Sequence, residues 1–174
     1  MSQIQQYLDQ YFLQLPQFAR HCATSEKELR HLLDAALIPA ASYVVTEAQQ
    51  ICSAVFGCIE APGTIPGNYF HPANKVWVEL AVQLLKKMNL SDAASQLRLQ
   101  FTQNFATSLQ KLDQEIWRLQ DSFDDRGNPL QEGLNQRCDF IWEHFLLGTC
   151  GLCVANPISE SAIARKEILQ EKLT

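Results

Sequence analysis

The sequence lacks long apolar segments and has little positive charge. No window reaches the roughly 18 apolar residues that a membrane-spanning helix needs, and the first residues carry neither a basic region nor a signal-like apolar run. We therefore expect a cytoplasmic protein with no membrane association. The 14 Lys and Arg residues face 19 Asp and Glu residues, for a net charge of −5. Because nucleic acids attract concentrated positive charge, a nucleic-acid partner is disfavoured.

Common catalytic and nucleotide-binding signatures are missing as well. The chain contains no glycine-rich phosphate loop, no Gly-x-Ser-x-Gly elbow, no kinase signature and no internal repeat. Whether it is an enzyme therefore stays open. Its 174 residues, 47% apolar and 19% charged, suit one globular domain, or a small module joined to a larger one.

Apolar residues recur at helical spacing through most of the chain. This pattern predicts helices over 4–15, 17–22, 25–38, 46–57, 72–88, 91–125 and 130–147, and a last helix from Ser159. A short β segment is expected at 42–45. We predict an all-α fold with at most one small β element near Tyr43, in which a helix-turn-helix-like module (1–60) packs on a bundle of long helices (61–174). One continuous domain is the alternative to this division.

Residues 16–40 have the layout of a helix-turn-helix. Ser25 is placed to cap the second helix, with Glu28 as its capping-box partner. The run Phe18 to Pro39 resembles the winged-helix start of MerR-type regulators, which implies that the helix after Ser25 would contact bases in the major groove. Residues 1–60 hold three basic and six acidic residues, however, and phosphates repel such a surface. A DNA-binding regulator is thus the second hypothesis for function.

The stretch Phe140 to Pro157 combines an apolar helix, a His, a glycine stop and a Cys-x-x-Cys turn. A zinc set of Cys138, His144, Cys150 and Cys153 is conceivable, because thiolates and imidazole are zinc ligands. Six residues along one helix rotate Cys138 about 240° from His144, so both cannot face one ion. We therefore predict no metal and no cofactor, and a buried Cys138 on the apolar stripe.

Two other roles for the cysteines are a redox dithiol and a catalytic nucleophile. A redox dithiol at Cys150 and Cys153 would need a helix directly after the motif, whereas Val-Ala-Asn-Pro intervenes. A Cys153 nucleophile activated by His144 or His71 has no supporting spacing, and a cysteine-dependent enzyme is the third hypothesis. A structural turn is the favoured interpretation of the motif. The six cysteines are expected to be reduced thiols rather than a disulfide framework.

The segment 58–74, rich in Pro and Gly, is predicted to be a long loop, and loops of this length are usually functional. Its Asn68 to His71 portion can bring polar groups to a pocket. We expect this loop to meet the turn after the helix over 130–147. The candidate binding residues are Tyr69, His71, His144, Cys150 and Cys153.

Five segments together resemble a bacterial family of unknown function whose members are often labelled natural product biosynthesis proteins. They are Ile4-Gln-Gln-Tyr-Leu-Asp-Gln-Tyr-Phe12, the junction from Leu37-Ile-Pro39 to Ser42-Tyr43, Phe70-His-Pro72, His144-Phe-Leu-Leu-Gly-Thr-Cys-Gly-Leu-Cys-Val-Ala-Asn-Pro157 and Ile163-Ala-Arg-Lys-Glu167. That family commonly has a Tyr in place of Cys150, so the resemblance assigns no role to a cysteine pair. It implies a cellular context and no mechanism. Our first hypothesis for function is a non-catalytic accessory protein that binds a small molecule or a protein partner. A homodimer is left open.

Overall fold

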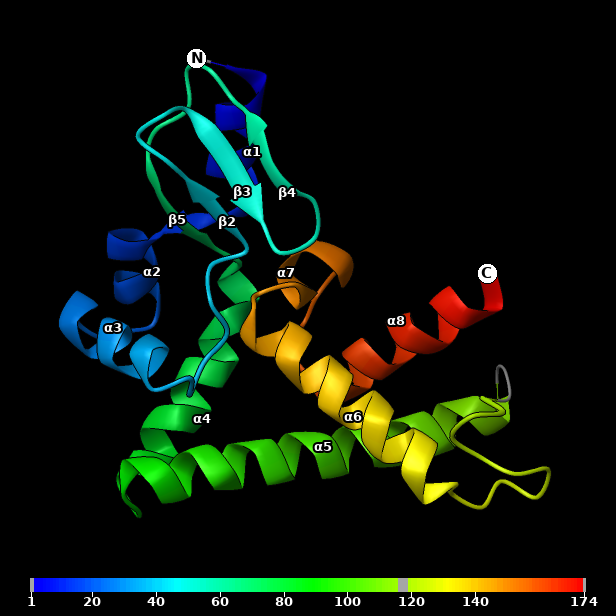
Figure 1. Cartoon of the computed structure of the whole chain (residues 1–174). Helices are drawn as coiled ribbons and strands as arrows, with labels where there is room; N and C mark the ends of the chain where they lie inside the picture. Colours follow the sequence, from blue (N-terminus) through cyan, green and yellow to red (C-terminus); the bar gives the residue numbers. More distant parts are fainter. Residues whose placement is uncertain (1, 116–118, 174) are drawn as a thin grey trace.

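The computed structural model describes residues 2–115 and 119–173 and shows an α+β protein (Figure 1). The helices are α1 (Gln3–Tyr11), α2 (Leu15–His21), α3 (Glu26–Asp34), the 3-10 helix η1 (Pro72–Asn74), α4 (Lys75–Leu85), α5 (Leu90–Glu115), α6 (Gln131–Leu146), α7 (Cys150–Cys153) and α8 (Glu160–Leu173). The strands are β1 (Leu13–Gln14), β2 (Tyr43–Val45), β3 (Gln50–Ser53), β4 (Gly57–Glu60) and β5 (Gly67–Phe70).

The five strands form one antiparallel sheet in the order β1-β5-β2-β3-β4. The expected all-α fold with at most one small β element is therefore wrong. The short β segment expected at 42–45 is present as β2, but it is one strand of five.

The segment 46–57 is a β-hairpin and not a helix. Thr46 and Gln49, at the start of the helix predicted over 46–57, form the turn between β2 and β3: the Thr46 N–H donates to the Gln50 carbonyl (2.9 Å) and the Thr46 Oγ1 accepts the Gln50 N–H (3.3 Å). A Thr hydroxyl can bond nearby backbone N–H groups at a turn as well as at a helix start. The same residue types therefore predicted the wrong element.

The predicted loop over 58–74 contains β4 and β5. Its Pro and Gly residues lie between and beside these four-residue strands, at Pro62, Gly63, Pro66 and Gly67, where they end one strand and begin the next. Strands this short leave too little alternation to outweigh the turn signals around them. The loop prediction was wrong for this reason.

The ends of two predicted helices also moved. The first helix stops at Tyr11, because Leu13 and Gln14 pair with Phe70 and Tyr69, and Pro16 opens α2 instead of ending α1. The long helix over 91–125 is real as α5 to Glu115. Residues 116–118 lie outside the described residues, and from Leu119 onward the chain turns back, with Phe123 bridged to Pro129.

Other predictions at the level of single elements are confirmed. Ser25 caps α3 by accepting the Glu28 N–H (3.1 Å), and α2 and α3 are joined by a short turn with Ala23 at φ 53°. The helix over 130–147 is α6, and the last helix, α8, starts directly after Ser159. Among the described helices, none has the length and apolar character that a membrane crossing needs.

The core has two adjoining parts. The larger one surrounds α5, where the Phe101 ring contacts Trp77, Trp142 and Phe145 with centroids 4.5–6.1 Å apart. The smaller part lies between α1 and the sheet and includes Leu8, Phe12, Val45, Ile51, Ala61 and Tyr69. Each fully buried Leu or Phe contributes about 1.5–3 kcal/mol by leaving water. The division of the chain at residue 60 stays a prediction.

Helix α7 lies between these two parts (Figure 1). On its sheet side, Leu152 packs against the smaller core cluster. On its other side, Cys150 and Val154 belong to the larger cluster. The Cys-x-x-Cys motif is therefore placed where the sheet meets the helices.

Candidate functional site

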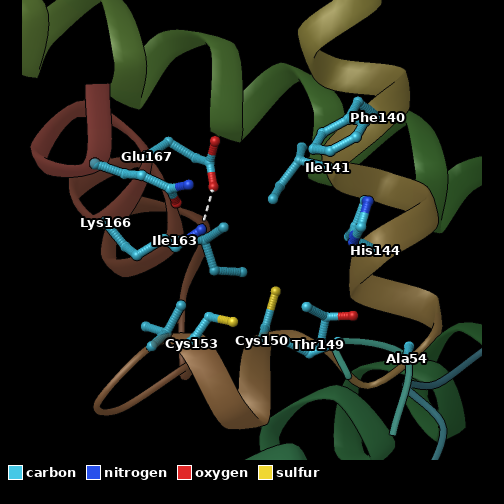
Figure 2. A pocket seen from close by; sticks show the side chains of 13 residues that line it. Ala54, Phe140, Ile141, His144, Thr149, Cys150, Cys153, Ile163, Lys166 and Glu167 are labelled. Carbon is cyan, nitrogen blue, oxygen red and sulfur yellow. Dashed lines mark hydrogen bonds and ion pairs between the residues drawn. The ribbon is translucent and has the colours of Figure 1, made fainter. Parts of the chain in front are cut away.

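A cavity of about 310 Å³ lies among α6, α7, α8 and the tip of the β3–β4 hairpin (Figure 2). Its apolar wall is formed by Val55, Phe140, Ile141, Val154 and Ile163. The polar groups are His144, Thr149, Lys166, Glu167 and Gln170, and two thiols, Cys150 and Cys153, complete the lining. A mainly apolar concave site with a few converging polar groups is the usual form of a small-molecule site.

Helix α6 supplies one wall through Phe140, Ile141 and His144. Phe140 and His144 are four residues apart on one helix face, and their ring centroids lie 4.2 Å apart. Cys138 lies on a different side of α6, where it is 6% exposed and its sulfur lies 3.7 Å from the Thr102 carbonyl oxygen. The predicted burial of Cys138 is confirmed.

The end of α6 is fixed by a glycine in the left-handed region. Gly148 has φ +77°, as predicted for the residue that ends this helix, and it turns the chain towards α7. Ala40 donates its N–H to the Leu146 carbonyl (2.9 Å), and the Ser42 hydroxyl donates to the Gly148 carbonyl (3.0 Å). The junction of α6 and α7 is thereby held against residues 40–42.

Helix α7 presents its cysteines to the cavity because its opposite side is pressed against the sheet. At Gly151, a Cβ atom would lie 2.2 Å from the Ser42 Oγ and 2.9 Å from the His71 Cβ. Only glycine fits this approach without a shift of its neighbours. Figure 2 shows the sulfur atoms of Cys150 and Cys153 on the cavity side of α7.

Helix α8 forms the polar wall. Ile163, Lys166, Glu167 and Gln170 share one helix face and line the cavity. Lys166 Nζ and Glu167 Oε1 lie 2.8 Å apart, and Glu167 is only 9% exposed (Figure 2). A largely buried carboxylate is therefore paired with a positive charge at the edge of an apolar space.

The hairpin tip closes the remaining side through Ala54 and Val55. Cys52 and Cys58 face each other on β3 and β4 and form a disulfide, so the expectation of six thiols is wrong for these two residues. Six residues apart in the chain, they come together only because the segment is a hairpin, which the helix prediction excluded. The Ser53 hydroxyl oxygen also accepts the N–H groups of Val55 (3.2 Å) and Phe56 (3.3 Å).

Three of the five candidate binding residues meet in this cavity: His144, Cys150 and Cys153. Tyr69 does not line it. Its side chain is 1% exposed, and its hydroxyl donates to the Ile65 carbonyl (2.9 Å) and accepts from the Gln14 side-chain amide (2.7 Å). Tyr69 thus ties α1, β1 and β5 together within the smaller core cluster.

His71 lies behind α7 and not in the cavity. Its Nδ1 accepts the Ala73 N–H (3.1 Å), and its ring packs edge-on against Phe12 at 5.8 Å. Burial lowers the pKa of this imidazole below its usual value. Through its contact with Gly151, His71 supports the helix that carries the two thiols.

The free thiols differ in their surroundings. Burial raises the pKa of Cys150 to about 12, with Lys166 acting in the opposite direction, and burial raises the pKa of Cys138 to about 11. Cys153 is exposed. Across the described ranges, no group of three or more His, Cys, Asp or Glu side chains is arranged to hold a metal ion.

A second, more open depression of about 760 Å³ runs along the outer side of α8. It shares Cys153, Val154, Lys166 and Gln170 with the cavity and continues past Leu169 to Leu173. The polar groups of α8 therefore stand at the border between an enclosed space and an open apolar groove.

Taken together, the fold and the cavity define an α+β protein with a small, mainly apolar cavity that opens to the surface. Residues 97–174 match the model of a family of unknown function (DUF6058). The matched segment includes most of α5 and all of α6, α7 and α8, and so every cavity residue except Ala54 and Val55. No curated protein and no solved structure matches the chain.

Sequence reasoning missed the α8 wall and the hairpin tip. The α8 residues carried a usable signal, because 163, 166, 167 and 170 recur at helical spacing and place two charges beside a buried isoleucine. Ala54 and Val55 carried none once the hairpin had been assigned as a helix. Nothing in the sequence distinguishes Thr149 from other polar residues, and only the structure shows that its hydroxyl is buried.

Proposed function

We propose that the chain is a binding protein for a small, mostly apolar molecule that occupies the cavity among α6, α7, α8 and the hairpin tip. The observation that carries the proposal is the cavity itself, a mainly apolar space of about 310 Å³ whose polar groups come from α6, from Thr149 before α7 and from α8. The size lies at the lower end of the range for small-molecule sites, roughly 300–1,000 Å³.

Thr149 supports this proposal. Its Oγ1 is buried and lacks a hydrogen-bond partner within the part of the protein that the structure describes. Leaving a buried hydroxyl unsatisfied costs about 1–3 kcal/mol. A ligand with one hydrogen-bonding group next to an apolar body would remove this cost, while the ion pair of Lys166 and Glu167 would contact a polar substituent at the other end.

An accessory role in natural-product biosynthesis is the cellular context that we propose for this binding. It rests on the resemblance of the sequence segments described above. The proposed role needs no catalytic residue, since a carrier or sensor of a small metabolite acts through the occupancy of its cavity.

The proposal is tested with a library of small apolar compounds that carry one or two polar groups, indole and octanoate among them. We expect several to bind in ligand-observed NMR, and Ala54→Trp to weaken their binding at least about tenfold by filling the cavity mouth. Glu60→Trp is the matched control, because Glu60 lies on the same hairpin, is exposed and does not line the cavity. Equal binding by both variants would place the compounds elsewhere and contradict the proposal.

DNA binding through α2 and α3 is a second candidate, supported by the succession of these two helices, which residues 22–25 join. The exposed residues of α3 weaken it, because Arg30 is paired with Glu26 (3.7 Å) and acidic side chains outnumber the basic ones. Duplex DNA should then bind at low salt, and a Lys27→Glu/Arg30→Glu variant should lose this binding. No binding at low salt would dismiss this candidate.

A further inference from the structure

The Cys150-Gly-Leu-Cys153 motif is itself one turn of helix, with a thiol on its first and its last residue. The motif forms this single helical turn by itself, and residues 154–159 separate it from α8. Residues three apart in a helix lie on the same face, with Cβ atoms about 5–6 Å apart. Both sulfur atoms therefore face the same cavity (Figure 2).

The separation of the two residues suits a disulfide after a small adjustment. Disulfide-bonded cysteines have Cα atoms about 4.4–6.8 Å apart and Cβ atoms about 3.5–4.5 Å apart, so the Cβ atoms must approach by about 1–2 Å. The contact of Gly151 with Ser42 and His71 anchors the centre of the turn. The approach of the two Cβ atoms therefore takes place at the ends of α7, which carry the thiols.

The two thiols differ in exposure, and this difference assigns each of them to one step of a two-step reaction. Cys153 is exposed and can be reached from the solvent side of the cavity. Cys150 is 6% exposed and lies behind it, against the larger core cluster. A reagent of moderate size therefore meets Cys153 first, and Cys150 is close enough to act on the product.

We propose that Cys150 and Cys153 form a reversible dithiol–disulfide pair that reduces small disulfides entering the cavity. The thiolate of Cys153 attacks one sulfur of a disulfide RS–SR, forming a mixed disulfide and releasing RS⁻. Cys150 then loses its proton to solvent, and its sulfur attacks the Cys153 sulfur and expels the second RS⁻. The protein gives up two electrons and two protons, and the small disulfide becomes two thiols.

The cavity favours substrates with an apolar substituent R. Phe140, Ile141 and Ile163 line the space beside the thiols. This activity goes beyond ligand binding and does not depend on it, because the reaction needs only the two thiols and access to Cys153.

The test uses the full chain and 2-hydroxyethyl disulfide as the probe, with peptide mapping in the absence of reductant. In Cys150→Ser, we expect a mixed disulfide that persists on Cys153. In the unsubstituted protein, we expect the adduct to give way to a Cys150–Cys153 disulfide, which mapping distinguishes from the Cys52–Cys58 disulfide. Cys150→Ala, which suits the apolar surroundings of this residue, repeats the trapping if the serine variant is unstable.

Cys153→Ser is the complementary variant, and it should react at least about tenfold more slowly, because its remaining thiols are buried. The second step also has a characteristic pH dependence. Burial raises the pKa of Cys150 to about 12, so at lower pH its thiolate fraction grows about tenfold with each unit by which the pH is raised. Loss of the adduct should accelerate by the same factor as the pH rises. The charged groups around Cys150 are Lys166 and Glu167 of α8 and the Cys153 thiol of its own helix, with His144 of α6 also lining the cavity.

Two results would overturn the proposal. One is an adduct that persists on Cys153 in the unsubstituted protein as long as it does in Cys150→Ser. The other is equal reaction of Cys153→Ser and the unsubstituted protein. Either result leaves the binding proposal intact, because binding of indole or octanoate is measured separately and without thiol chemistry.

Discussion

The imidazole of His71 is half-buried behind α7 and accepts the Ala73 N–H at the start of η1 (3.1 Å). Because burial disfavours the imidazolium, the pKa of His71 in the folded protein lies below the usual 6.5. As the pH falls below about 6.5, this imidazole becomes protonated in the unfolded chain before it does so in the folded protein. The free energy of unfolding is therefore not reduced by His71 above about pH 6.5, and it decreases as the pH is lowered further.

We therefore expect His71→Asn to flatten the acid side of the stability profile. Asn keeps a side-chain acceptor for the Ala73 N–H but does not titrate. Urea unfolding at a series of pH values measures the slope. His31→Asn, on the exposed surface of α3, is the control and should leave the slope unchanged. An unchanged slope in His71→Asn would show that other groups cause the acid sensitivity.

At the scale of single residues, sequence reasoning was right about Cys138, Ser25 and Gly148, because each prediction used a local pattern: an apolar helical stripe, a helix cap and a glycine stop. It selected Tyr69 and His71 as polar residues near a pocket. The pairing of β1 with β5 brings Gln14 to Tyr69, whereas Ile65 and Ala73 are neighbours of Tyr69 and His71 in the sequence and reach them through the local path of the backbone. Which polar groups are already satisfied depends on this backbone path, and the loop prediction for 58–74 did not contain it.

The α6–α7 junction is the element that sets the orientation of the cavity. Gly148 combines φ +77° with a close approach, since a Cβ atom there would lie 2.5 Å from the Ala40 carbonyl oxygen and 2.8 Å from that of Ala41. These neighbours are backbone atoms that cannot rotate away. Any side chain at this position must move the junction or the segment 40–42.

We expect Gly148→Ala to lower the free energy of unfolding by about 2–5 kcal/mol, the sum of a left-handed backbone cost and overpacking. Gly57→Ala is the matched control, because Gly57 has a similar φ of +73° but no atom lies within 4 Å of the position that a Cβ would take. It should cost only about 1–2 kcal/mol, the conformational part alone. Chemical denaturation compares the two. Equal losses would mean that the contact with residues 40–42 contributes nothing.

The hairpin β3–β4 shows why element prediction failed where it did. Its strands have four residues each, and Thr46 carries the same chemistry at a turn as at a helix cap. The helices α5, α6 and α8 were found because their apolar stripes extend over three or more turns. The cavity walls formed by α6 and α8 were therefore within reach of the sequence, whereas the wall formed by Ala54 and Val55 was not.

At the scale of the whole molecule, the sheet contacts the helices through α2, where Phe18 stacks on Phe70, and through α7, and the cavity lies beside α7 (Figure 1). The matched family segment contributes the helical walls, and the sheet contributes the hairpin tip. The helical half of this arrangement followed from periodicity. The way in which α7 docks on Ser42 and His71 depends on contacts between residues about 80 to 110 positions apart, which periodicity does not encode.

The central claim is that this cavity binds a small apolar molecule, and isoleucine methyl NMR during titration with indole or octanoate tests it most directly. Ile141 and Ile163 line the cavity, whereas Ile51 is buried in the smaller core cluster and serves as the internal reference. We expect saturable shifts of the Ile141 and Ile163 methyl signals, no shift at Ile51, and loss of the response in Ala54→Trp. Binding that shifts neither Ile141 nor Ile163 would contradict the account.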